Sequence, residues 1–142
     1  MTEKILLIDD EVDFLSVMAD RMQARNMQVS TASSAKEGLA KAETGAYDAV
    51  ILDLMMPEMD GIATLKILKE KNPDLQVILL TGHATIKQSI EAMKLGALDL
   101  LEKPADINTL TDKIHAAQAQ RMLIIEKKNE KIIKKILATK GW

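Results

Sequence analysis

In the sequence "AVILDLMMPEMDG", residues 49–61, an apolar run ends in a single carboxylate, Asp53. Consecutive apolar residues are typical of a strand that is buried on both faces of a parallel sheet. An unpaired charge inside such a core would be costly. We therefore expect a strand over residues 47–53, with Asp53 at its end opening onto a polar pocket. The turn at residues 57–61 should lead into the next helix.

Short apolar runs and helical patterns alternate along the rest of the chain. Further strands are expected at residues 4–8, 27–31, 75–81 and 98–102. Helices are expected at 12–25, 34–44, 60–71 and 85–95, with a last helix after Asp106 that runs on toward Leu137. This alternation predicts an α/β fold. We expect a flavodoxin-like, doubly wound, five-stranded parallel sheet of order 2-1-3-4-5 with an extended C-terminal helix.

The composition is that of an ordinary single domain, with 142 residues of which 47% are hydrophobic. There is no cysteine, which excludes disulfides and zinc–thiolate sites. No apolar run is long enough to span a bilayer. Acidic residues follow the first apolar stretch directly, unlike the pattern of a signal peptide. We expect a soluble cytoplasmic protein with no membrane partner.

Charge is distributed unevenly along the chain. Residues 121–142 hold seven basic and two acidic side chains, a net charge of +5, whereas residues 1–120 carry a net charge of −7. An acidic body argues against direct nucleic-acid binding by that part of the chain. The basic tail is either a solvated helix face or a contact for an anionic partner.

Polar side chains follow four of the five predicted strands. Asp9 and Asp10 follow the first, Asp53 ends the third, Thr81 ends the fourth and Lys103 follows the fifth. Carboxyl ends of parallel strands meet at one edge of a sheet, where such folds bind ligands. Clustered carboxylates repel one another, and oxygen-only ligands suit Mg²⁺. Each acid alone would be better explained as a loop residue or a helix cap, Thr81 alone as an ordinary strand end and Lys103 alone as an ordinary surface lysine.

This cluster has a chemical interpretation. The Asp53 carboxylate is a candidate nucleophile that takes a phosphoryl group as an acyl phosphate. Mg²⁺, the Thr81 hydroxyl and the Lys103 ammonium would then stabilise the phosphoryl oxygens.

Four motifs, in this order and spacing, resemble the receiver domain of bacterial two-component response regulators. They are "ILLIDDE" (5–11), "DLMMPEMDG" (53–61), "LLTGHA" (79–84) and "EAMKLGALDLLEKP" (91–104). The last is similar to receivers attached to AAA+ transcription activators of the nitrogen-regulator type. The resemblance covers about residues 4–120. It implies a receiver domain over 1–120 and a basic amphipathic helical extension or linker over 121–142.

The resemblance assigns the acidic residues. Asp53 would be the phospho-acceptor, supplied by a sensor histidine kinase or a phosphotransfer protein. Asp10 and Asp53 would bind Mg²⁺ directly, and Asp9 mainly through water. The backbone carbonyl of Met55 would complete the metal shell.

The resemblance also assigns the switching residues. Thr81 would be the hydroxyl that moves toward the phosphoryl group, and Lys103, before a cis peptide at Pro104, would contact that group. Met55 and His83 match two variable positions that tune hydrolysis of the acyl phosphate. The chain departs from the family at Leu100, where an aromatic partner of the switch is frequent. A smaller repacking would then have to carry the signal to the fifth strand.

We therefore expect a signalling receiver that assists its own phosphorylation, and not an enzyme acting on external substrates. The alternative is a Mg²⁺-dependent phosphatase or phosphotransferase with an aspartyl nucleophile. Such enzymes usually carry a second acid two residues later, where this chain has Met55. A flavin-binding protein fits less well, because "DDEVDF" after the first strand would repel phosphate.

An apolar seam runs along the tail, which lies beyond the part of the chain that resembles the family. Its members follow 3,4,3,4 spacing: Met122, Ile125, Asn129, Ile132 and Ile136. A single Asn at an a position fixes register in parallel coiled coils. One hypothesis is that the extension pairs two copies as a homodimer. The alternatives are packing of the extension on its own domain or on another partner, since Ile124, Ile133 and Leu137 blur the seam.

Overall fold

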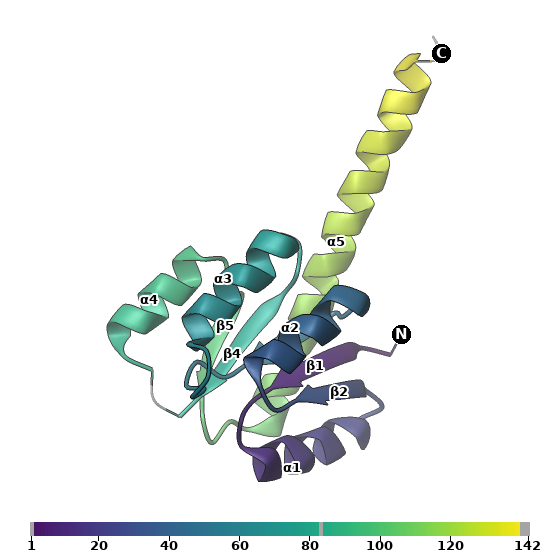
Figure 1. The fold of residues 1–142 in the computed structure, drawn as a ribbon. Coiled ribbons are helices and arrows are strands. Elements are labelled where there is room, and N and C mark those ends of the chain that lie inside the picture. Colours follow the sequence, from purple (N-terminus) through teal and green to yellow (C-terminus); the bar gives the residue numbers. More distant parts are fainter. Residues whose placement is uncertain (1, 83, 140–142) are drawn as a thin grey trace.

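The computed structural model describes residues 2–82 and 84–139, and within them five strands alternate with five helices. The strands are parallel and lie in the order β2-β1-β3-β4-β5 (Figure 1), which confirms the predicted fold. In chain order the elements are β1 (Lys4–Ile8), α1 (Val12–Gln23), β2 (Gln28–Ala32), α2 (Ala35–Thr44), β3 (Ala49–Leu52), α3 (Gly61–Lys71), β4 (Val77–Thr81), α4 (Ile86–Lys94), β5 (Asp99–Glu102) and α5 (Ile107–Thr139).

The predicted boundaries differ from the structure mainly at the ends of elements. Helix α1 ends at Gln23, not Arg25, because Asn26 adopts a positive φ of 66° and reverses the chain. Asparagine tolerates this conformation better than most residues. Strand β3 is shorter than predicted, and Asp48 and Asp53 flank it. Helix α5 runs to Thr139, slightly beyond the expected end.

Helices cover both faces of the sheet, as the doubly wound fold requires. Helices α1 and α5 lie on one face, and α2, α3 and α4 lie on the other (Figure 1). The side chains of β1 alternate between the two faces. Ile5 and Leu7 pack with α1 and α5, while Leu6 and Ile8 pack with the helices of the other face. All four side chains are buried, so the central strands read as continuous apolar runs.

Helix α5 has two distinct parts. Its first half packs on the sheet through Leu110, Ile114 and Ala117, which are fully buried. Its second half continues past the body as a single straight helix (Figure 1). No helix in the described part of the chain is both long enough and apolar enough to cross a membrane.

Candidate functional site

The sheet register brings the predicted residues together at one edge. Ile8 pairs with Leu52, so Asp9 and Asp53 emerge side by side, and the Asp53 N–H donates to the Ile8 carbonyl at 3.0 Å. On the other side, the Lys103 N–H donates to the Thr81 carbonyl at 2.9 Å. The backbone ladder therefore fixes where these side chains start.

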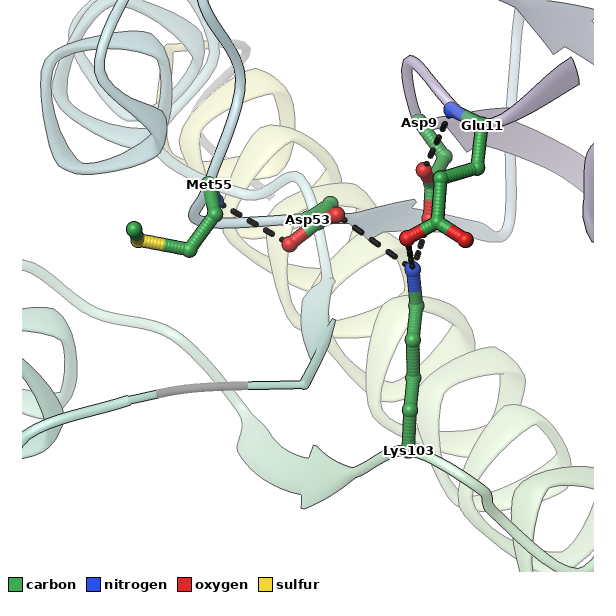
Figure 2. Close-up of polar contacts among 5 residues, drawn as sticks. All are labelled: Asp9, Glu11, Asp53, Met55 and Lys103. Carbon is green, nitrogen blue, oxygen red and sulfur yellow. Dashed lines mark hydrogen bonds and ion pairs between the residues drawn. The ribbon is translucent and has the colours of Figure 1, made fainter.

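The Lys103 ammonium lies at the centre of the cluster (Figure 2). Its Nζ is 2.6 Å from Asp9 Oδ2, 3.3 Å from Asp53 Oδ2 and 3.2 Å from Glu11 Oε1. The side chains of Asp9 and Asp53 are 4% exposed and that of Lys103 is 12% exposed, so the contacts of Lys103 with these two acids are shielded from water, unlike its contact with the exposed Glu11. The Nζ also lies 4.1 Å from the centroid of the Phe14 ring, within range of a cation–π interaction.

Sequence reasoning did not assign Glu11 and Phe14 to the site. Both lie at the start of α1, directly after the carboxyl end of β1. An acid and an aromatic residue in the first turn after a ligand-binding strand end could have served as a signal. Phe14 is the only phenylalanine of the chain, and its ring lies beside the Lys103 ammonium.

Asp53 is less open than the sequence suggested. Asp53 is 4% exposed, because Lys103, which directly follows β5, extends over it (Figure 2). Its Oδ1 accepts a hydrogen bond from the Met55 N–H at 3.0 Å, while Oδ2 faces Lys103. The carboxylate is thus buried but fully paired, which resolves the cost of placing a charge at the end of a core strand.

Three carboxylates form a group that suits a hard divalent cation. Asp9, Asp10 and Asp53 each offer an oxygen, and these oxygens lie within 4.8 Å of one another. Asp9 and Asp53 also bond to protein groups, whereas the Asp10 side chain makes no hydrogen bond within residues 2–82 and 84–139. An all-oxygen donor set in a partly open pocket fits Mg²⁺, which keeps several waters.

The electrostatics of the cluster reflect an excess of negative charge. Burial raises the pKa of the Asp9 carboxyl, and the nearby Asp53 charge adds to this, so hydrogen bonds from Lys103 and the Glu11 N–H offset it only in part. Burial lowers the pKa of the Lys103 ammonium, but bonding to Asp9 and attraction to Asp53 outweigh it, so the net shift is upward. Lys103 therefore remains a cation at neutral pH.

Thr81 is buried at the end of β4 without a partner for its hydroxyl. Its Oγ1 is the one buried side-chain oxygen or nitrogen in the described residues that lacks a hydrogen bond. Buried hydroxyls in folded proteins nearly always bond to something. The orphaned hydroxyl at the same edge as Asp53 is therefore available to an incoming ligand oxygen.

The loop after Asp53 is held close to the site by Gly61. The Gly61 N–H donates to the Leu54 carbonyl at 3.0 Å. A Cβ at Gly61 would lie 2.3 Å from the Leu54 Cα and 2.7 Å from the Asp53 carbonyl oxygen, so no other residue fits without moving this backbone. Met55, on this loop, is 52% exposed and points away from the cluster (Figure 2).

The remaining predictions have mixed outcomes. The Lys103–Pro104 peptide is cis, as the resemblance implied. The role of the Met55 carbonyl stays a prediction, and His83 lies outside the described residues. Leu100 is half-buried and packs against the core layer of α2, α3 and α4. That layer holds α4 weakly, since Ala92 is the one fully covered residue of the helix.

Comparison with known proteins identifies the family. The model for the response regulator receiver domain matches residues 5–115, which is most of the chain. The chain belongs to the response regulator receiver family. It is a receiver domain of two-component signalling, a family whose members are phosphorylated on an aspartate.

Relatives and solved structures agree with this assignment. The transcriptional regulatory protein ZraR of Escherichia coli O157:H7 is 34% identical over 120 residues, covering 84% of this chain and 27% of ZraR. The acid tolerance regulatory protein ActR of Rhizobium meliloti is 38% identical over 119 residues, covering 84% of this chain and 59% of ActR. A receiver domain structure from Clostridium thermocellum superposes with a TM-score of 0.81 at 37% identity, covering 86% of this chain and 98% of that one. The receiver thus spans only part of the curated relatives that it matches.

Proposed function

We propose that Asp53 is the phospho-acceptor of this receiver and that a sensor histidine kinase or phosphotransfer protein in the cytoplasm supplies the phosphoryl group. The observation that carries the proposal is the surroundings of the Asp53 carboxylate. One cation, Lys103, lies 3.3 Å from its oxygen, further acids lie beside it, and Thr81 offers an unpaired buried hydroxyl at the same edge.

The chemistry follows from these groups. An Asp53 oxygen attacks phosphorus, the new P–O bond forms as the P–N bond to the donor histidine breaks, and the imidazole leaves with a proton from solvent. The attacking oxygen would have to be freed from Lys103, whose ammonium then follows the negative charge onto the phosphoryl oxygens. The Met55 N–H, 3.0 Å from Oδ1, holds the other carboxylate oxygen in place.

We propose that Asp10 and Asp53 hold Mg²⁺ directly, that Asp9 acts mainly through water and that the Met55 carbonyl completes the protein ligands. The all-oxygen donor set supports this assignment. A bound Mg²⁺ ion would neutralise the acids and screen the approaching phosphoryl oxygens. The Asp10 carboxylate is best suited to bind it, since it has no protein hydrogen-bond partner among the described residues.

Thr81 and Lys103 would detect the phosphoryl group once it is attached. The Thr81 hydroxyl gains a hydrogen-bond acceptor, and Lys103 exchanges carboxylate contacts for a phosphoryl contact. Leu100, two places before the last residue of β5, lies on the strand that pairs with the Thr81 strand. A small inward movement of Thr81 would therefore change the packing of Leu100 and of the weakly held α4. No rotation of an aromatic side chain would be needed.

This function is that of a receiver and not of an enzyme acting on external phosphomonoesters. The position two residues after Asp53 is Met55, which cannot act as the general acid that a hydrolase needs for the leaving group. We also propose that residues 1–120 form the receiver and that residues 121–142 form a helical extension or linker. The packing of α5 supports this division, since its last buried residue is Ala117.

Intact-mass measurement after incubation with a small phosphodonor and Mg²⁺ tests the phospho-acceptor. The wild-type chain should gain one phosphoryl group, and Asp53→Asn should gain none. Asp48→Asn is a matched control, because Asp48 is also a buried aspartate (6% exposed) next to β3 but lies at its opposite end. Asp48→Asn should be phosphorylated like the wild type.

Two outcomes would contradict the proposal. An adduct of equal size on the wild type and Asp53→Asn would assign the phosphoryl group to another residue. Sustained turnover of an external phosphomonoester, lost in Asp53→Asn, would favour the hydrolase alternative.

A further inference from the structure

The second half of α5 projects from the body with few attachments (Figure 1). Within the described residues, two ion pairs join it to the domain: Arg121 with Asp48 at 2.9 Å, and Lys128 with Asp74. Both basic residues lie on the same side of the helix, seven positions apart. Among residues 2–82 and 84–139, no other side chain of the helix after Arg121 forms an ion pair or hydrogen bond with the body.

The projecting half is amphipathic, and its apolar face is exposed. Five apolar side chains that are 43–56% exposed lie on one face: Met122, Ile125, Ile132, Ile133 and Ile136. Leu123 and Leu137 are exposed beside it. The opposite face is basic, with Lys127, Lys131 and Lys134. A row of large apolar side chains on a helix with charges opposite is unusual for a surface that faces only water.

The spacing of this row is that of a coiled coil. With Met122 at an a position, Asn129 and Ile136 are the next a positions, and Ile125 and Ile132 are d positions. The two body attachments, Arg121 and Lys128, then both fall at g positions, beside the seam and not on it. Attachment to the body therefore leaves the a and d positions open.

A groove runs along the first part of this face. Its volume is about 550 Å³, and its walls are formed by Asp48 from the body together with Arg121 and the seam residues Met122, Ile125 and Asn129. The groove has Glu126 on the other rim, at an e position. In a parallel pair, g and e positions of the two helices face each other, so Arg121 would meet Glu126 of the partner subunit with opposite charge.

We propose that this face binds a second copy of the chain, as a parallel, in-register, two-stranded coiled coil over residues 122–139. Parallel pairing is favoured because it matches Asn129 with Asn129 of the partner subunit, and a paired buried Asn fixes register. It also brings the oppositely charged g and e positions together. The inference does not rest on the proposed phosphorylation, because the seam is exposed in the structure as it stands.

Sedimentation of the full chain over a range of concentrations, without phosphodonor or Mg²⁺, tests the pairing. The wild type should shift from monomer to dimer as concentration rises. Ile132→Asp, in the seam, should stay monomeric at every concentration. Leu123→Asp is the matched control, because Leu123 is similarly exposed (51% against 56% for Ile132) but lies at a b position outside the seam, so it should dimerise like the wild type.

Single-cysteine variants test orientation and register, and the natural absence of cysteine makes them unambiguous. Under mild oxidation, Ile125→Cys should form a covalent dimer, since equivalent d positions meet in a parallel pair and a disulfide requires close Cα atoms. Lys131→Cys, on the basic face, should not. A wild type that stays monomeric, equal loss of dimer in Leu123→Asp and Ile132→Asp, or crosslinking through Lys131→Cys would each overturn the proposal. An Ile125→Cys variant that dimerises without crosslinking would overturn the parallel register.

Discussion

The two ends of the central sheet place buried aspartates beside long basic side chains, but they leave these groups in different states. At the amino end, Asp48 Oδ2 accepts from the Lys4 N–H at 2.8 Å and Oδ1 accepts from Arg121 at 2.9 Å. One acid has one cation there, and both of its oxygens are bonded. This end has the features of a structural anchor, which joins β1, β3 and α5.

At the carboxyl end, the charges do not balance. Four acids, Asp9, Asp10, Glu11 and Asp53, gather around a single cation, Lys103. The buried Thr81 hydroxyl at the same edge has no partner in the part of the chain that the structure describes. At the amino end the buried acid and its cation are already paired, whereas the carboxyl end has room for a cation beside its acids and for an acceptor of the Thr81 hydroxyl.

Removal of Lys103 should have the largest effect. Lys103→Met leaves Asp9 and Asp53 buried without their cation, and breaking a buried pair in this way costs about 3 kcal/mol of unfolding free energy. Urea denaturation without Mg²⁺ measures it. Lys113→Met is the control, since the Lys113–Asp99 pair is more than a third exposed and should change stability by less than about 1 kcal/mol. Equal losses of unfolding free energy in the two variants would mean that the ion pairs of Lys103 stabilise the fold no more than an exposed surface pair.

Mg²⁺ should stabilise the wild type because it supplies the missing positive charge. At about a hundred times its dissociation constant, a ligand of the folded state adds about 2.7 kcal/mol. The rise in Tm on adding Mg²⁺ should be largely lost in Asp10→Asn and kept in Asp20→Asn, an exposed acid of α1. If Asp10→Asn retained the full rise, the metal would have to bind elsewhere.

Disruption of the amino end should affect stability alone. Asp48→Ala leaves the Lys4 N–H and the Arg121 guanidinium without their acceptor, at a cost of about 2 kcal/mol. Its rate of phosphorylation by a small phosphodonor should equal that of the wild type. A marked fall in that rate, measured where the variant is still folded, would show that the two ends are coupled.

Much of the fold and site could be predicted from sequence because both depend on local patterns. Continuous apolar runs in β1, β3 and β4 identify strands buried on both faces, and a parallel sheet must then bring their carboxyl ends together. That reasoning predicts that Asp9, Asp53, Thr81 and Lys103 meet at one edge of the sheet. It depended on the order of elements and not on any side-chain conformation.

The details that were missed depend on where long side chains point. Strand patterns place the Lys103 backbone but not its ammonium, which extends over Asp53 and makes that residue more buried than expected. The contact between Lys103 and Phe14 joins residues far apart in the sequence. The extension shows the same limit, since the spacing of Ile125 and Ile132 predicted an apolar face, whereas only the structure shows that the body leaves it exposed.

A pH series should give the smallest effect and test the charge imbalance most directly. Because burial and Asp53 raise the pKa of Asp9 above its ordinary value of 3.8, the folded protein favours the neutral carboxyl. The contribution of Asp9 to stability is therefore fully present below that value and is lost as pH rises through the folded pKa. In EDTA, the unfolding free energy of the wild type relative to Asp9→Asn should fall as the pH rises above 3.8, the ordinary pKa of the carboxyl. With saturating Mg²⁺ the slope should change sign, because an Asp9 carboxylate that acts on the metal mainly through water must also be ionised. If the unfolding free energy of the wild type instead rose relative to that of Asp9→Asn with increasing pH in EDTA, Lys103 would already balance the acids. The two ends of the sheet would then be alike in their charge balance.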